Sequence, residues 1–309
     1  MKPFALLLWI YLVPPVCAKI GVVSEFVGST PCDAEPRGFL GIGAADACER
    51  ITWQLALSAD AQPSTFRLRV VYGMQARNEP GFEGGGATRE LNGTWTTLKG
   101  TASDPAAIVY RLTADKPERS MQFGKIGDDL LHLLNQRREL MVGNGGWSYT
   151  LNRKGGVARR NSAAGFEPAS GHHPGAAGVF DGRSPCQDLA RQLAIRAGSD
   201  CMKLKWRLIL YQDAATGAPA QYILEGSPYR DAPRKGKWVF ARIKNDPKAL
   251  VYQLDLGEPG GVLSLLKADD NILLFLNKDG GFLLGDIYFS YTLNRITEKP
   301  IHSGAGARH

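Results

Sequence analysis

Apolar and polar residues alternate along much of the chain, which is the pattern of a β-strand with one buried face. The clearest alternation covers residues 50–58 and 202–210. Further strand candidates in the first half cover 22–28, 66–72, 91–97, 106–112, 119–125, 130–135 and 147–152. Turn residues such as Asn92-Gly93 separate these segments, so the sequence predicts about eight short strands before residue 153.

A helical pattern is clear in one place only, at Gln187–Ala197. The corresponding segment in the first half is rich in glycine, and we expect it to be irregular. Eight short antiparallel strands favour a closed barrel, because closure removes exposed sheet edges. A sandwich of two sheets is the alternative.

The same series of motifs occurs twice in the chain. Phe26–Cys32 matches Phe180–Cys186, and the hexapeptide Ser148-Tyr-Thr-Leu-Asn-Arg153 recurs unchanged as Ser290–Arg295. The offset falls from 154 residues (26 to 180) to 142 residues (148 to 290), so the first copy carries an insertion of roughly ten residues. We place this insertion at Gly84-Gly85-Gly86. The repeat is too long for a solenoid unit and predicts two tandem domains.

The domain boundaries follow from the repeat and from composition. The two domains cover residues 19–153 and 179–297, and each is predicted to be a small all-β barrel of eight antiparallel strands. Residues 154–178 are rich in Gly, Ala, Ser and Arg and are predicted to be a flexible linker. The tail at 298–309 has a similar composition.

Residues 1–18 have the three parts of an export signal. Lys2 precedes an apolar stretch, and Val16-Cys17-Ala18 provides a cleavage site with small residues. We expect cleavage after Ala18 and a periplasmic protein. Lipidation of Cys17, which would give an outer-membrane lipoprotein, is the alternative, although Pro14-Pro15-Val16 fits a lipobox poorly.

Four cysteines remain after this cleavage, and an even number in an exported protein indicates disulfides. Cys32 and Cys48 are 16 residues apart, and Cys186 and Cys201 are 15 apart. Four cysteines allow three connectivities, but the duplication favours Cys32–Cys48 and Cys186–Cys201, because each domain can then fold alone.

Composition and motifs argue against several classes of function. The 309 residues are 44% hydrophobic and 22% charged with a net charge of +7, which excludes a wholly disordered chain. No later apolar run approaches the length of a membrane span, which excludes a polytopic membrane protein. The sequence has no nucleophile elbow, His-Glu-x-x-His or P-loop, so we expect a non-enzymatic protein, with an unrecognised hydrolase as a remote alternative. An exported chain is not expected to bind nucleic acid.

Candidate metal ligands are few, and we predict no metal site. His172-His173 lies in the predicted linker, where paired imidazoles bind metal weakly at most. His132 lies in a run of leucines, and we take Phe275 as its equivalent in the second copy, which favours a packing role. Trp53 and Trp206 recur in both copies and are expected in the core.

Together, these motifs resemble a known family. Each copy is similar to the N-terminal domain of the NlpE-type copper-resistance and envelope-stress lipoproteins of Gram-negative bacteria. The resemblance covers nearly the whole mature chain and rests on motifs present in both copies: Gly28–Cys32, Gly93–Trp95 and Tyr149–Leu151 in the first, and Gly182–Cys186, Gly236–Trp238 and Tyr291–Leu293 in the second.

The resemblance implies a lipocalin-like barrel on the periplasmic side of an outer membrane. It also implies a role in copper tolerance or envelope stress through ligand binding or contact with an envelope protein. The alternative is a lipocalin-type carrier that holds a small apolar ligand in a barrel. The family's second cysteine of Pro-Cys-x-x-Cys is replaced by Glu35 and Leu189, so copper is only a weak alternative as a cofactor.

Overall fold

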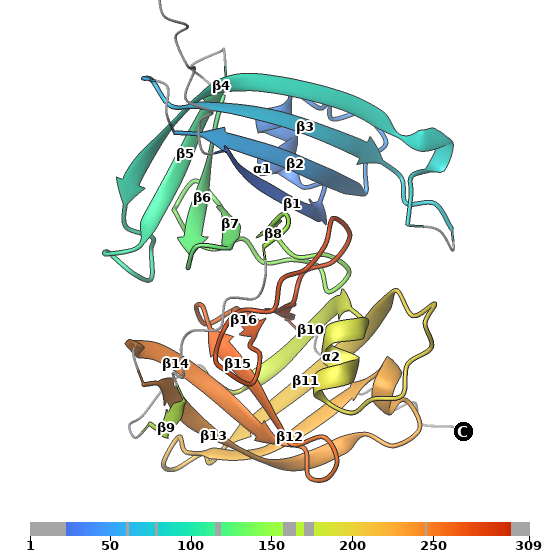
Figure 1. Ribbon diagram of the computed structural model, residues 1–309, viewed down its shortest axis with the longest axis vertical. Helices are drawn as coiled ribbons and strands as arrows, with labels where there is room; N and C mark the ends of the chain where they lie inside the picture. The colour runs from blue at the N-terminus through green and yellow to red at the C-terminus, as the bar shows by residue number, and fades with distance from the viewer. Residues whose placement is uncertain are drawn as a thin grey trace, which may run out of the picture.

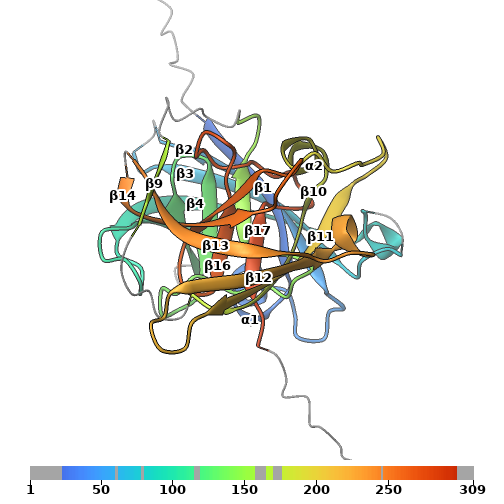
Figure 2. The same ribbon diagram turned by 90° about the horizontal axis from the view of Figure 1, so that it is seen from below.

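The structure is a computed structural model that describes residues 23–59, 62–77, 80–114, 119–156, 165–169, 176–244 and 246–297. The predicted export signal with Cys17, the pair His172-His173 and the tail at 298–309 lie outside the described residues. Two closed antiparallel β-barrels follow each other along the chain and stack along the long axis of the molecule (Figure 1). Figure 2 shows the same stack viewed along that axis. The all-β fold class with two eight-stranded barrels is confirmed.

The first barrel is a simple meander in which each strand pairs with the next and β8 pairs with β1. Most strands alternate buried and exposed residues, as the periodicity predicts. The strands are β1 (Val23–Pro31), β2 (Arg50–Ser58), β3 (Thr65–Gly73), β4 (Ala87–Lys99), β5 (Ile108–Ala114), β6 (Ser120–Ile126), β7 (Leu130–Leu134) and β8 (Thr150–Arg153).

The second barrel repeats this order and closes through the pairing of β12 with β13 and of β10 with β17. Its strands are β10 (Gly178–Pro185), β11 (Lys203–Gln212), β12 (Pro219–Gly226), β13 (Arg234–Ile243), β14 (Asp246–Asp255), β15 (Val262–Lys267), β16 (Ile272–Phe275) and β17 (Thr292–Arg295).

One further strand corrects the predicted linker at 154–178. Strand β9 (Phe166–Pro168) lies within this segment and pairs with Ala241–Ile243 of β13. The β13 edge has free backbone groups there because β12 pairs only with residues 234–237. Composition could not show this, because a strand of three residues has almost no periodicity, and the open edge is a property of the folded barrel.

Each barrel also carries one short helix between its first two strands. Helix α2 (Gln187–Gln192) is shorter than the predicted segment, and α1 (Ala34–Leu40) occupies the place where we expected irregular chain. The expectation for the first copy is therefore wrong. Burial of Phe39 and Leu40 against the core stabilises α1, and Gly41 ends it at φ 66°, a conformation that glycine adopts easily. Two single-turn helices, η1 (Glu83–Gly85) and η2 (Ser227–Tyr229), precede β4 and β13.

The duplication is visible in repeated side-chain contacts. The indole Nε1 of Trp53 donates to Thr30 Oγ1 at 2.8 Å, and that of Trp206 donates to Ser184 Oγ at 2.9 Å. Both tryptophans are buried in their barrel cores, as expected. A buried indole N–H without a partner would be costly, so each copy has kept a hydroxyl for it.

A second pair of tryptophans locates the insertion. Trp95 and Trp238 donate to the carbonyls of the equivalent residues Ser58 and Tyr211. There are 21 residues between Gly73 and Trp95, but only 11 between the equivalent Gly226 and Trp238. The ten additional residues therefore lie in the connection between β3 and β4, which contains the three consecutive glycines.

The two disulfides are the predicted pairs, Cys32–Cys48 and Cys186–Cys201. In both barrels the disulfide joins the end of the first strand, just before the helix, to the start of the second strand. The helical connection is thereby closed into a loop at the same place in each barrel.

We predict that the Cys32→Ala/Cys48→Ala and Cys186→Ala/Cys201→Ala variants each lose stability by about 3 kcal/mol, because each opens a loop of similar length in the unfolded chain. Urea unfolding monitored by circular dichroism measures this loss. Wild type under reducing conditions is the control and should show both losses. An unchanged urea midpoint in either variant would contradict the prediction.

Candidate functional site at the junction between the barrels

The two copies of the hexapeptide Ser-Tyr-Thr-Leu-Asn-Arg meet where the barrels touch. Asn294 Oδ1 of the second barrel accepts the backbone N–H of Gly143 at 2.8 Å, and Asn152 Oδ1 of the first accepts that of Gly285 at 2.9 Å. These two contacts exchange equivalent residues, since each member is 142 positions from its counterpart. The junction therefore has the reciprocal form of a two-fold symmetric dimer interface within one chain.

Hydroxyl groups of the hexapeptides form a chain through the centre of this junction. Ser148 and Ser290 lie 2.6 Å apart, Ser290 Oγ donates to Thr292 Oγ1 at 3.0 Å, and Thr292 Oγ1 donates to Thr150 Oγ1 at 3.0 Å. All four residues are buried. Buried hydroxyls need partners, and here each barrel supplies the partners of the other.

His132 on β7 ends this chain. Its Nε2 lies 2.8 Å from the carbonyl oxygen of Met141, and its Nδ1 lies 2.9 Å from Thr150 Oγ1. A carbonyl only accepts, so Nε2 carries the proton, and Nδ1 of the neutral ring accepts from Thr150. Complete burial lowers the pKa of His132 to about 4, which keeps the ring neutral at pH 7.

The equivalent of His132 in the second barrel is Leu274, and our assignment of Phe275 is wrong. His132 pairs with Thr150 across β7 and β8, and Leu274 pairs with Thr292 across β16 and β17. Phe275 is one position further on and lies in the barrel core. The packing role expected for His132 is therefore combined with a specific polar role that leucine cannot supply.

An apolar cluster beside the hydroxyl chain completes the contact. Leu130 and Leu134 of β7 pack with Ile272 and Leu274 of β16, and Phe282 packs against them. The neighbours Leu131 and Leu133 belong to the interior core of the first barrel. Strand β7 is therefore buried on both faces, which explains why its sequence is a continuous apolar run. Figure 1 shows β7 and β16 on the facing sides of the two barrels.

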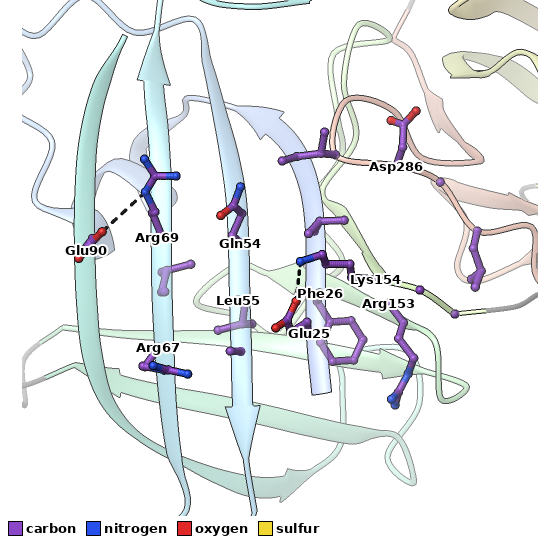
Figure 3. A pocket seen from close by; sticks show the side chains of 18 of the residues that line it. Glu25, Phe26, Gln54, Leu55, Arg67, Arg69, Glu90, Arg153, Lys154 and Asp286 are labelled. Carbon is purple, nitrogen blue, oxygen red and sulfur yellow. Dashed lines mark hydrogen bonds and ion pairs between the residues drawn. The ribbon is translucent and has the colours of Figure 1, made fainter. Parts of the chain in front are cut away.

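A cleft of about 740 Å³ opens beside the junction (Figure 3). The outward faces of β1 to β4 form one wall, and Lys154–Gly156 and Leu284–Ile287 of the second barrel form the other. Its side chains carry both charges: Lys154 pairs with Glu25 at 2.9 Å, and Arg69 pairs with Glu90 at 3.6 Å. Both pairs are exposed and contribute little to stability, so their charges are accessible to a binding partner.

Aromatic side chains fill the interiors of both barrels. Trp53 and Phe123 meet edge to face in the first barrel, with ring centroids 6.4 Å apart. Trp238 and Tyr252 lie 5.1 Å apart in the second, and all four residues are buried. An eight-stranded barrel is just wide enough either for its side chains or for one small ligand. In these barrels the side chains occupy the space.

The predicted site residues are not brought together. Cys32 and Cys48 lie in the first barrel and Cys186 and Cys201 in the second, each as a disulfide. Among the described residues, no group of three His, Cys, Asp or Glu side chains could hold a metal ion, and the absence of a metal site stays a prediction. No helix in the described part of the chain is long and apolar enough to cross a membrane.

Sequence reasoning missed the junction, although two signals pointed to it. The hexapeptide is identical in both copies at polar as well as apolar positions, whereas most of the repeat has diverged. Residues 130–134 and 272–276 are also almost wholly apolar, which is typical of strands buried on both faces. Together these features indicate a second buried surface outside each barrel.

Comparison with known proteins adds no relative: no family model, no curated protein and no solved structure matches this chain. The resemblance to the NlpE-type family therefore stays a prediction.

We predict that Asn152→Ala and Asn294→Ala cost similar amounts, about 1–3 kcal/mol each, because each leaves a buried glycine N–H without its acceptor. Urea unfolding of the purified variants measures both losses. Asn92→Ala, on the exposed face of β4, is the matched control and should change stability by less than about 0.5 kcal/mol. A large loss in only one of the two junction variants would contradict a reciprocal junction.

We predict that the protein loses stability as the pH falls from about 6.5 towards 4. In this range the unfolded His132 binds a proton that the folded one excludes, so its contribution is complete above pH 6.5 and declines below it. The loss between pH 6.5 and pH 5 should be about 2 kcal/mol. His132→Leu, which copies the residue at position 274, should lack this loss in urea unfolding at both pH values. Equal pH dependence in wild type and variant would refute the assignment to His132.

Proposed function

We propose that this is an exported, non-enzymatic periplasmic protein that serves copper tolerance or the envelope-stress response through contact with an envelope partner. The resemblance of each copy to the NlpE-type domain supports the biological role. The export signal predicted at 1–18 supports the compartment. The two disulfides are consistent with it, because such bonds persist in oxidising surroundings.

The observation that carries the proposal is the junction itself. Reciprocal hydrogen bonds and a shared apolar cluster join the barrels into one body, and the cleft beside the junction has walls from both. A partner that binds there contacts residues such as Arg67 and Asp286, which are far apart in sequence. Its affinity therefore depends on the correct pairing of the barrels.

Contact with a partner fits the chemistry better than copper chelation by cysteine. Copper(I) prefers thiolate ligands, and the four described sulfurs are bonded to one another. The carrier alternative also changes form, because packed interiors favour the cleft over a barrel lumen as the place for a small ligand. The mixed charges of the cleft favour a polar partner surface over an apolar ligand.

Deletion of the gene in the source bacterium tests this role. We expect the deletion strain to grow less well than wild type on copper or under envelope stress. The wild-type gene should restore growth, and a gene lacking codons 2–18 should not, because its product stays in the cytoplasm. Unchanged growth of the deletion strain under both stresses would contradict the proposal.

Complementation with cleft variants tests the mode of action. Arg67→Glu reverses a charge inside the cleft and should restore growth less well than wild type. Arg111→Glu makes the same change on the exposed part of β5, outside the cleft, and should restore it fully. Equal complementation by both variants would contradict a contact at the cleft, whereas the deletion phenotype would still support the biological role.

A further inference from the structure

Four cations from both barrels gather at another part of the junction. Arg50 begins β2 of the first barrel, and Arg183, Lys203 and Lys205 lie on β10 and β11 of the second. The pKa of Lys203 is lowered by partial burial and then by the charges of Arg183, Lys205 and Arg50, so all four contribute to one region of positive potential.

Aromatic rings hold three of these cations in place. The guanidinium of Arg50 lies 5.7 Å from the ring centroid of Trp147, and that of Arg183 lies 5.6 Å from the same ring. The Lys203 ammonium lies 5.5 Å from the ring of Phe289. Trp147 and Phe289 are equivalent residues of the two copies, so the pseudo-two-fold symmetry of the junction brings two cation–π pairs to the same region.

Arg50 is the most unusual member of the group. Its exposed fraction is only 2%, and its Nη2 donates to the carbonyl oxygens of Pro80 and Gly81 at 2.7 and 3.2 Å. Its Nε has no hydrogen-bond partner among the described residues. Burial lowers the pKa of Arg50 to about 10, so it is still charged at pH 7.

Carboxylates do not balance this charge. Glu49 is near enough to influence Arg50 and Arg183, but within the described part of the chain none of the four cations forms an ion pair. Four cations against one carboxylate leave a net charge of about +3 and mutual repulsion in partly dry surroundings. A tetrahedral oxyanion placed among them would relieve that repulsion and accept charge-assisted hydrogen bonds.

We infer that the junction is a binding site for a phosphate group, held by Arg183, Lys203 and Lys205 with Arg50 behind them. Lys203 and Lys205 are exposed and Arg183 is partly exposed, so the phosphate can enter from solvent. Trp147 and Phe289 provide apolar surface on which the rest of the ligand can pack. The inference depends on the junction alone and not on the proposed role in copper tolerance or envelope stress.

Calorimetric titration of the full mature chain with inorganic phosphate, and separately with phosphatidylglycerol vesicles, tests the inference. We expect saturable binding that weakens as salt is added. Lys203→Gln/Lys205→Gln should lower the affinity about tenfold or more, because it removes charge-assisted contacts. Lys235→Gln/Lys237→Gln removes the same charge from exposed positions on β13 and should leave the affinity within about twofold. All four lysines are exposed, so both variants should unfold at the wild-type temperature.

Each result decides the question. Binding of inorganic phosphate that is lost only in the 203/205 variant supports the site and shows that free phosphate is sufficient. Binding of the vesicles alone, lost in the same variant, supports it and identifies a lipid headgroup as the source of the phosphate. Absence of binding to both probes, or equal weakening in both variants, would overturn the inference.

Discussion

The buried polar contact between the two hexapeptides determines how the barrels sit against each other. From Ser148 through Ser290, Thr292 and Thr150 to His132, each group donates to the next, and the chain crosses between the barrels twice. Apolar surfaces could slide past one another with little change in burial. Buried hydroxyls cannot, because a shift of one residue leaves donors and acceptors unpaired. The cleft and the cation cluster both depend on this register, because each takes residues from both barrels.

This contact also explains why the hexapeptide is unchanged. Elsewhere a residue of one copy packs within its own barrel and can vary if its neighbours adapt. At the junction Ser148 meets Ser290 and Thr150 meets Thr292, so a change in either copy alters a contact that both share. The exception is His132 opposite Leu274. It can differ because the chain of hydroxyls needs a terminal acceptor at one end only.

The fold could be predicted from the sequence because its determinants are local or repeated. Alternation at 50–58 and 202–210 gave strands, and equal cysteine spacing in both copies gave the disulfide pairs. Helix α1 escaped prediction because burial of Phe39 and Leu40 outweighs its weak local preference. Strand β9 depends on an open edge that exists only after β13 has formed. The candidate site was not predicted, because Arg50, Arg183 and Lys203 are each ordinary strand residues until the barrels are placed together.

The ten additional residues between β3 and β4 make the two halves unequal. In the first barrel this connection brings Phe82 to 4.3 Å from the guanidinium of Arg50, and its Pro80 and Gly81 carbonyls bind that group. The second barrel has no such cover, and its equivalent cation, Lys203, faces solvent. The duplicated positions have thus become specialised: one positive charge is locked into the architecture, and its twin stays free to meet other molecules.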